Sequence, residues 1–234
     1  MDLTFASYNI RKAVGLDRRR DPGRILAVLH EIDADVIGLQ EVDRRFGRRE
    51  SVLPRAALDD SPWRAVPVHQ RPESLGWHGN ALLVRRTIDV AEAAQVPLPT
   101  LEPRGAIRAD LMVEGRRLRV AGMHLDLSGL RRRHQARAVL EHLSACNHGH
   151  CPTVLMGDLN EWATRGGVFR EFGEDWQVLN PGRSFPARRP VAPLDRIIAT
   201  PDWTVIATGV HHSALAAVGS DHLPVLARLV LPKN

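Results

Sequence analysis

The chain has 234 residues, of which 44% are hydrophobic and 5% are aromatic. This length and this content of apolar residues exclude a disordered chain and favour one domain, residues 1–234, around one substantial core. The 32 basic and 27 acidic residues give a net charge of +5, which favours phosphate-bearing partners but is far from the charge of a histone-like tail.

No apolar stretch approaches the ~20 residues that a membrane-spanning helix needs. The first ten residues also lack the basic region and the long apolar run of a secretory signal. We therefore expect a soluble, cytoplasmic protein without a transmembrane segment.

The first predicted elements each bring a polar side chain to the end of a strand. Residues 3–10 form a predicted strand with Asn9 near its end. A helix is predicted next, because Asp21 suits the N-cap position and Pro22 the first helical position. Residues 36–39 are apolar on both faces, as in a strand covered on both sides, and Glu41 follows this strand almost at once.

Glu41 is the strongest candidate for a metal ligand. A carboxylate after a buried strand must be solvated, paired or metal-bound, because an isolated buried charge is costly. Magnesium and manganese prefer carboxylate oxygens and water as ligands. The alternative is a salt bridge to one of the arginines that follow, which are Arg44, Arg45, Arg48 and Arg49.

The middle of the chain alternates loops and strands. Residues 43–61 are a predicted surface loop, 63–69 a strand, 70–78 a second loop and 79–84 a strand that begins Gly-Asn. In this strand Asn80 has an alternative interpretation as a simple turn residue. Arg104 precedes a strand that runs to residue 113, and the Glu114-Gly115 turn predicts a hairpin with residues 118–123. His124 and Asp126 follow the second hairpin strand.

A helix is predicted over residues 130–146, with an apolar stripe at Leu130, His134, Ala138 and residues 140–143 and with a solvated basic face of arginines beside it. Cys146, His148, His150 and Cys151 come next. A zinc site is one interpretation, but the spacing lacks the separated ligand pairs of zinc sites and favours a polar loop. A disulfide is not expected in a cytoplasmic chain.

The strand over residues 152–157 leads to Asp158 and Asn160. Side chains two residues apart in a strand share a face, so this carboxylate and this amide can hold a water molecule beside an oxygen that gains charge. The alternative is an Asx turn that ends the strand. Residues 162–189 form a loop region with a helical patch at 168–172. Further strands are predicted at 194–199, which contains Asp195, at 203–210, and at 224–230 after Ser220-Asp221-His222.

These strand-end motifs, from Tyr8-Asn9-Ile10 to Ser220-Asp221-His222, together resemble the endonuclease/exonuclease/phosphatase superfamily of metal-dependent phosphoesterases. Abasic-site endonucleases, secreted deoxyribonucleases, sphingomyelinases and inositol-polyphosphate phosphatases belong to it. The specificity of the resemblance lies in the order and spacing of the motifs. It implies a four-layer α/β sandwich, in which two face-to-face, mostly antiparallel sheets are flanked by helices.

The resemblance also implies a role for each candidate residue. The metal ligands are Glu41 and Asn9, with Asp221 as a further ligand, and the metal is Mg²⁺ with Mn²⁺ as a substitute. The catalytic residues are Asp158 and Asn160, which orient or activate water, and His124 and His222, which donate to phosphate oxygens, with Asp195 holding the ring of His222. Either Asp158 or His222 can be the base. The residues near the substrate are Asn80, Arg104 and Asp126.

The expected reaction is hydrolysis of a phosphodiester by metal-assisted in-line attack of water. A nuclease, acting as an endonuclease or exonuclease on DNA more than on RNA, is the first hypothesis. The alternative enzyme is a phosphatase or phosphodiesterase that acts on a phospholipid headgroup or another small phosphate ester. Outside enzymes, the alternative is an inactive module that binds nucleic acid or a membrane surface through basic residues.

Overall fold

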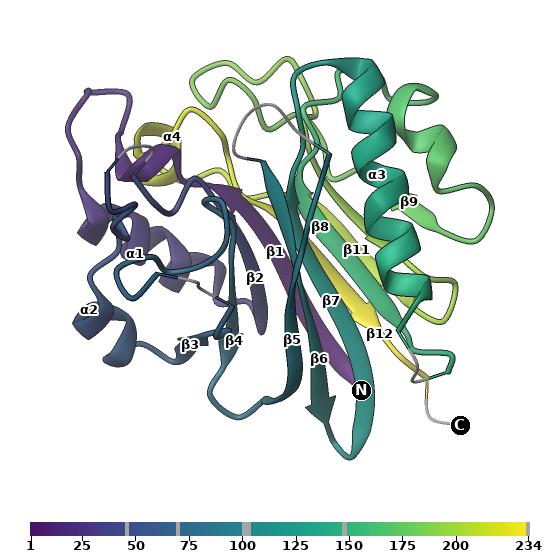
Figure 1. The fold of residues 1–234 in the computed structure, drawn as a ribbon. Helices are drawn as coiled ribbons and strands as arrows, with labels where there is room; N and C mark the ends of the chain where they lie inside the picture. The colour runs from purple at the N-terminus through teal and green to yellow at the C-terminus, as the bar shows by residue number, and fades with distance from the viewer. Residues whose placement is uncertain (45–46, 69–70, 100–103, 147–148, 233–234) are drawn as a thin grey trace.

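The computed structural model describes residues 1–44, 47–68, 71–99, 104–146 and 149–232. Two six-stranded sheets pack face to face, and helices lie against their outer faces (Figure 1). The predicted four-layer α/β sandwich is confirmed. None of the helices in these described ranges is long and apolar enough to cross a membrane.

The first sheet has the strand order β11-β12-β1-β2-β4-β3. Its strands are β1 (Asp2–Asn9), β2 (Val36–Gln40), β3 (Trp63–Ala65), β4 (Ala81–Arg85), β11 (Thr204–Val210) and β12 (Val225–Val230). Only β1 and β2 pair in parallel in this sheet, and the other pairs are antiparallel. The side chains at the carboxyl ends of β1 and β2 therefore meet at one edge of the sheet.

The second sheet has the order β5-β6-β7-β8-β10-β9. Its strands are β5 (Asp89–Val96), β6 (Gly105–Val113), β7 (Arg116–His124), β8 (Thr153–Asp158), β9 (Gln177–Leu179) and β10 (Asp195–Ala199). Again one central pair, β7 with β8, is parallel and the others are antiparallel. Both sheets thus place a parallel pair at their centre, next to the facing sheet.

The helices are α1 (Pro22–Ile32), α2 (Arg55–Asp59), α3 (Gly129–Ser144) and α4 (Ala216–Gly219), with short 3₁₀ helices η1 (Arg11–Ala13) and η2 (Gly167–Glu171). The predicted start of α1 is confirmed. Asp21 is the N-cap, its carboxylate accepts a hydrogen bond of 2.9 Å from the backbone N–H of Arg24, and Pro22 takes the first position.

Three apolar layers result from this arrangement. The central one lies between the sheets and includes Phe5, Met156 and Trp203. A second lies between the first sheet and α1, and a third lies between the second sheet and α3. Within the second sheet, a small residue is required where the backbones of neighbouring strands approach closely. A Cβ atom at Gly157 would lie 1.9 Å from the carbonyl oxygen of Met123 on the neighbouring strand, so only glycine fits there.

The predicted stripe of α3 is wrong. Leu130 is 65% exposed, whereas Arg132 is buried. The guanidinium of Arg132 reaches back to the carbonyl of Leu127 at 2.6 Å and to the carboxylate of Glu161 at 3.3 Å. The side chain buried at the start of this helix is therefore a paired arginine and not an apolar residue.

Other sequence predictions also differ from the structure. The loop predicted at 43–61 contains α2. The strand predicted at 63–69 is shorter, because β3 ends at Ala65; its last residue, His69, lies outside the described residues. β5 and β9 were not predicted at all, and most β5 side chains are only partly buried or exposed. An edge strand of this kind has a weak apolar pattern.

Candidate active site

Alternation along the strands brings four predicted site residues to one edge of the space between the sheets. Asn9, His124, Asp158 and Asp195 have the parity of Phe5, Val120, Met156 and Ile197, which belong to the central apolar layer. In the second sheet, Asp158 is the register partner of both His124 on β7 and Asp195 on β10. The site is therefore built where apolar positions of the central layer give way to polar ones.

Asp158 is the centre of this cluster. It is almost fully buried, at 1% exposure. One of its carboxylate oxygens, Oδ2, accepts a hydrogen bond of 3.0 Å from the side-chain amide of Asn9 on the facing sheet. The same oxygen lies 3.3 Å from Nε2 of His124 and 3.7 Å from Nε2 of His222. One carboxylate oxygen is thus contacted by residues from β1, β7 and the segment before β12.

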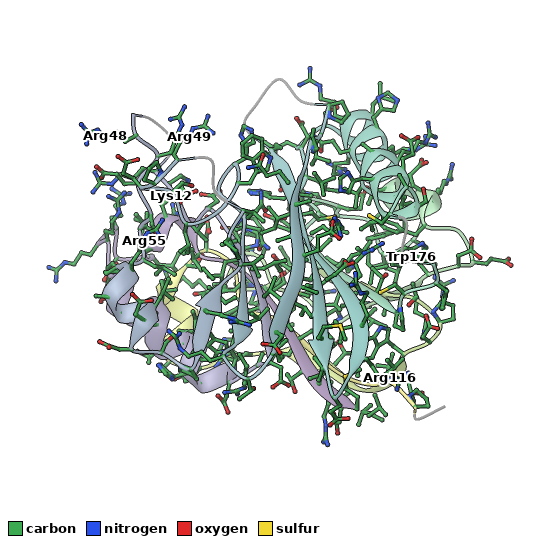
Figure 2. All side chains as sticks on the ribbon, turned by 60° about the horizontal axis from the view of Figure 1, so that its bottom comes forward. Lys12, Arg48, Arg49, Arg55, Arg116 and Trp176 are labelled. Carbon is green, nitrogen blue, oxygen red and sulfur yellow. The ribbon has the colours of Figure 1, made fainter. Side chains whose placement is uncertain are left out.

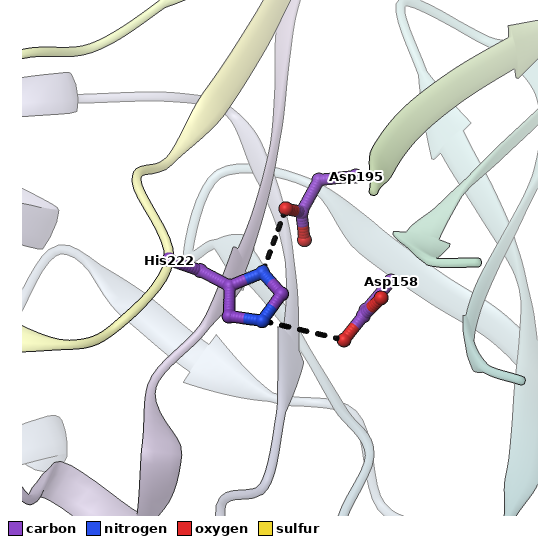
Figure 3. Close-up of side chains that lie close together, drawn as sticks. All are labelled: Asp158, Asp195 and His222. Carbon is purple, nitrogen blue, oxygen red and sulfur yellow. Dashed lines mark hydrogen bonds and ion pairs between the residues drawn. The ribbon is translucent and has the colours of Figure 1, made fainter. Parts of the chain in front are cut away.

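The ring of His222 lies between two carboxylates (Figure 3). Its Nδ1 is 2.8 Å from Oδ2 of Asp195, and its Nε2 faces Asp158. Asp195 also accepts a hydrogen bond from the hydroxyl of Ser184. The predicted pairing of Asp195 with the late histidine is present in the structure, and it fixes the orientation of the ring.

The charges of this cluster shift the pKa values in opposite directions. Burial alone would raise the pKa of Asp158, but the imidazoles of His222 and His124 and the amide of Asn9 outweigh it and hold this pKa well below its usual range. Burial raises the pKa of Asp195. Burial would lower the pKa of His222, but Asp195 and Asp158 outweigh it and raise this pKa well above its ordinary value. At neutral pH the ring is therefore an imidazolium.

We expect the ring of His222 to stay protonated well above pH 7 in the metal-free protein, as followed by NMR of its ring nitrogens. In Asp195→Asn, the loss of the main attractive charge should bring its pKa down toward that of an ordinary histidine. Because the folded-state pKa is raised, the stability it contributes is fully present below the unfolded pKa, about 6.5, and is lost as pH rises through the folded pKa. An unshifted His222 in the parent protein would contradict this account.

Asn160 does not continue β8, because the strand ends at Asp158. Asn160 adopts a left-handed conformation with φ of 51°, and its backbone N–H donates to Oδ1 of Asp158 at 2.9 Å. Its side-chain amide donates to the carbonyl of Leu125 at 2.9 Å. The alternative interpretation, an Asx turn that ends the strand, is therefore correct, and the turn locks the carboxylate of Asp158 in place. The expectation that Asp158 and Asn160 share a strand face is wrong, because β8 ends at Asp158.

Glu41 and Asp221 lie at a turn that carries two cations. Glu41 pairs with Lys12, and Asp221 lies 3.2 Å from Nε of Arg11. Arg11, Lys12 and Ala13 in η1 all have positive φ values between 45° and 57°, which is a strained conformation for non-glycine residues. The turn is held by the oxygen of Asn9, which accepts from the N–H of Arg11 at 3.1 Å, and by the carbonyl of Glu41, which accepts from the N–H of Lys12 at 3.0 Å.

The alternative interpretation of Glu41, a salt bridge to one of the arginines that follow it, is not found in the described residues. Arg44 pairs with Glu50, Arg48 pairs with Glu73, and Arg49 contacts His78, while Arg45 lies outside the described residues. Burial would raise the pKa of Glu41, but His124, Lys12 and Arg104 outweigh it and lower this pKa. Glu41 is therefore an anion that attracts a cation.

The residues predicted to hold a metal fit a hard divalent ion. Glu41 and Asp221 offer carboxylate oxygens whose side chains are 26% and 30% exposed, so the oxygens are accessible. The amide oxygen of Asn9 is of the same hard type. A second set of ligand atoms, from Asp158, Asp195 and His222, lies within 4.8 Å of one another. In this second set, however, the imidazolium of His222 already neutralises the charge of the carboxylates. The set of Glu41, Asp221 and Asn9 therefore suits a metal ion better.

The three residues predicted near the substrate have different surroundings. Arg104 contacts Nε2 of His124 and so belongs to the cluster. The side-chain nitrogen of Asn80 donates to the carbonyl of Gly105 at 3.0 Å, and its oxygen is buried without a partner among the described residues. Asp126 accepts from the N–H of Ser128 at 2.8 Å at the start of α3. Arg104 is thus the best placed of the three to meet a phosphate.

Sequence reasoning missed several residues of this site. Lys12 stands out in the sequence as one of two lysines, but nothing local shows that its strained turn reaches Glu41. The ring of Phe185 packs on that of His222 with centroids 4.8 Å apart, and Trp162 meets Phe185 edge to face at 6.5 Å. Because these aromatic residues come from irregular segments, no periodic pattern marks them.

The fold and this cluster define the protein as a phosphoric ester hydrolase. Residues 6–222 match the model of the Endonuclease/Exonuclease/phosphatase family, and the chain belongs to that family. The YbhP protein of Escherichia coli K12 is 28% identical over 214 residues, which cover 82% of each protein.

Solved structures share the fold over nearly the whole chain. An endonuclease/exonuclease/phosphatase from Bacteroides vulgatus has a TM-score of 0.80 at 20% identity, covering 99% of this chain and 100% of that one. Danio rerio TDP2 complexed with a single-strand DNA product has a TM-score of 0.74 at 16% identity, with coverages of 98% and 99%. A mannosyl-6-phosphatase from Bacteroides thetaiotaomicron has a TM-score of 0.72 at 21% identity, with coverages of 97% and 99%.

Proposed function

We propose that the protein is a Mg²⁺-dependent phosphodiesterase that acts as a nuclease, on DNA more than on RNA, with residues 1–234 as a single domain. Glu41, Asn9 and Asp221 would hold Mg²⁺, or Mn²⁺ in its place, and the bound ion supplies positive charge against the anionic phosphate. The donor set supports this assignment, because all three residues offer hard oxygen atoms at one edge of the sandwich. A cytoplasmic location stays a prediction.

The remaining residues divide the chemistry according to their charge. Asp158, an acceptor with a lowered pKa, orients the attacking water and accepts its hydrogen bond. The imidazolium of His222, held by Asp195, donates to a phosphate oxygen that gains charge in the transition state. His124 and Arg104 add donors beside it. With its proton in place, His222 acts as a donor in this scheme, and Asp158 acts as the charged acceptor that positions the water.

The choice of nucleic acid rests on the aromatic chain from His222 through Phe185 to Trp162. Trp162 is 61% exposed although it is a large apolar side chain. The row of contacting rings thus runs from His222 to the surface. Exposed aromatic rings beside a phosphate site stack with bases. Lys12, Arg48 and Arg49 lie together on one side of the molecule (Figure 2) and can neutralise a phosphate backbone.

Replacing Trp162 by alanine should raise KM for an oligonucleotide about tenfold, since stacking of one base is worth roughly 1–3 kcal/mol. Activity on bis-p-nitrophenyl phosphate, which has no base, should change little. Trp176→Ala is the matched control, because this tryptophan packs against Phe172 in the layer under α3. Equal KM values for the oligonucleotide in Trp162→Ala and the parent protein would count against base stacking.

The function itself is tested by assaying the purified protein with Mg²⁺ on plasmid DNA, abasic duplex, single-stranded DNA, RNA, phospholipids and sugar phosphates in parallel. The proposal expects the highest kcat/KM on a nucleic acid, and Asp158→Ala should be inactive on every substrate. A preference for a phospholipid or a sugar phosphate would overturn the nuclease assignment.

The alternative is a phosphatase or phosphodiesterase for a small ester such as a sugar phosphate or a phospholipid headgroup. The structural likeness to a mannosyl-6-phosphatase supports it at the level of the fold. In that case Trp162 would pack against the organic part of the ester. The hypothesis of an inactive binding module is not retained, because the chain belongs to a family of hydrolases and has the acid and histidine set together.

A further inference from the structure

A cavity outside the candidate active site lies against the second sheet. Its volume is about 640 Å³. Arg196 of β10 lines it together with Arg165 and Arg170, and Thr164 and Asn180 add polar groups. Among the described residues, no acidic side chain lines this cavity, so its walls bring three positive charges and no negative one.

The cavity and the active site lie on opposite faces of β10. Ile197 belongs to the layer between the sheets and Ile198 to the layer under α3. Because side chains alternate along a strand, Asp195 faces inward to His222 while Arg196 faces outward. The two adjacent residues therefore serve different sites.

Arg196 is the unusual group of this cavity. It is 1% exposed, yet no carboxylate among the described residues forms an ion pair with it. Its Nη1 donates to the carbonyl oxygens of Pro193 and Asp195, its guanidinium stacks on the ring of Phe169 at 5.3 Å, and its Nη2 has no partner in the described part of the chain.

The acids that act on Arg196 are already engaged. Asp195 pairs with His222 at 2.8 Å. Glu161 accepts from Arg132 at 3.3 Å and from the backbone N–H groups of Ala163 and Val168 at 3.1 Å each. Burial lowers the pKa of Arg196 to about 10, which still leaves it charged at neutral pH. A buried guanidinium without a carboxylate partner is costly unless an anion balances it.

We propose that this cavity is a second, non-catalytic anion site that binds a phosphate group, with Arg196 at its floor. Its Nη1 already donates to two carbonyl oxygens, so Nη2, which has no partner in the described part of the chain, is the nitrogen that would donate to a phosphate oxygen. Arg165 and Arg170 are exposed, and no hydrogen bond or ion pair holds them among the described residues. They close over the anion from the loop side. The site is independent of the substrate proposed above.

The test is calorimetric titration of inorganic phosphate into the metal-free protein in EDTA, at constant ionic strength. The double variant Arg165→Ala/Arg170→Ala leaves the buried Arg196 in place and should preserve the fold, which is to be checked by circular dichroism melts. Its affinity for phosphate at this site should fall at least about tenfold, since each charged hydrogen bond contributes on that order. Arg228→Ala, an exposed arginine of β12, is the matched control.

Phosphate can also bind at the candidate active site, so Arg104→Ala is titrated in parallel. The second site is supported if Arg104→Ala and Arg228→Ala still bind phosphate and the double variant does not. Loss in Arg104→Ala with full retention in the double variant assigns the phosphate to the active site and overturns the proposal. Absence of any binding heat in the parent protein overturns it as well. None of these outcomes depends on whether the enzyme is a nuclease.

Discussion

Replacing Asp158 by asparagine is expected to reduce kcat on a phosphodiester by about a thousandfold or more, with little change in KM. General-base and electrostatic contributions of single groups each reach roughly 10²–10⁴ in rate. The loss should be large because Asp158 accepts a hydrogen bond from Asn9 and forms ion pairs with His124 and His222. The carboxamide of the Asp158→Asn variant cannot act as a charged acceptor for the attacking water. Steady-state kinetics on bis-p-nitrophenyl phosphate with Mg²⁺ measures the effect.

The matched control for this variant is Asp202→Asn. Asp202 is a carboxylate beyond the other end of β10, where it contacts His150 at 2.6 Å. It should keep nearly parental activity. Both variants should have melting temperatures close to that of the parent protein, or the comparison of rates would report on folding. Parental turnover in Asp158→Asn would remove this residue from the mechanism.

Glu41→Gln is expected to weaken binding of Mn²⁺ by about a hundredfold, because the charge and number of ligand oxygens set the affinity of hard cations. In the structure, Glu41 is an anion whose partner is Lys12. A neutral amide in its place keeps the shape of the side chain and removes the attraction. Calorimetric titration of Mn²⁺ measures this without relying on activity. Glu50→Gln, an exposed partner of Arg44, is the matched control.

Lys12→Met should have the opposite effect on the affinity for Mn²⁺ in the same titration. The ammonium group of Lys12 competes with a metal ion for Glu41, so its removal should tighten Mn²⁺ binding, by up to about fivefold for one lost ion pair of this kind. A metal that binds elsewhere would be indifferent to both substitutions. Opposite shifts in Glu41→Gln and Lys12→Met therefore locate the metal at this carboxylate, whereas unchanged affinities in both would rule this location out.

Much of this fold can be predicted from the sequence because apolar periodicity and turn residues mark its inner elements. β1, β2, β7, β8 and β10 are covered on both faces, and their nearly continuous apolar runs are visible in the sequence. Edge strands such as β5 were missed because exposure removes that pattern. The stripe of α3 was misplaced because Arg132 is buried through its charge partners, which periodicity does not report.

The sequence by itself determined which residues are the candidates for the chemistry, since acids, histidines and amides at strand ends are a local property of the chain and their order resembles the family's. The tertiary structure alone decided how they meet. Because of strand parity and register, Asn9 contacts Asp158 on the facing sheet. The strained turn places Lys12 against Glu41. It also decided that Arg196 faces away from its neighbour Asp195. Contacts between residues more than a hundred positions apart depend on packing, and no local pattern encodes them.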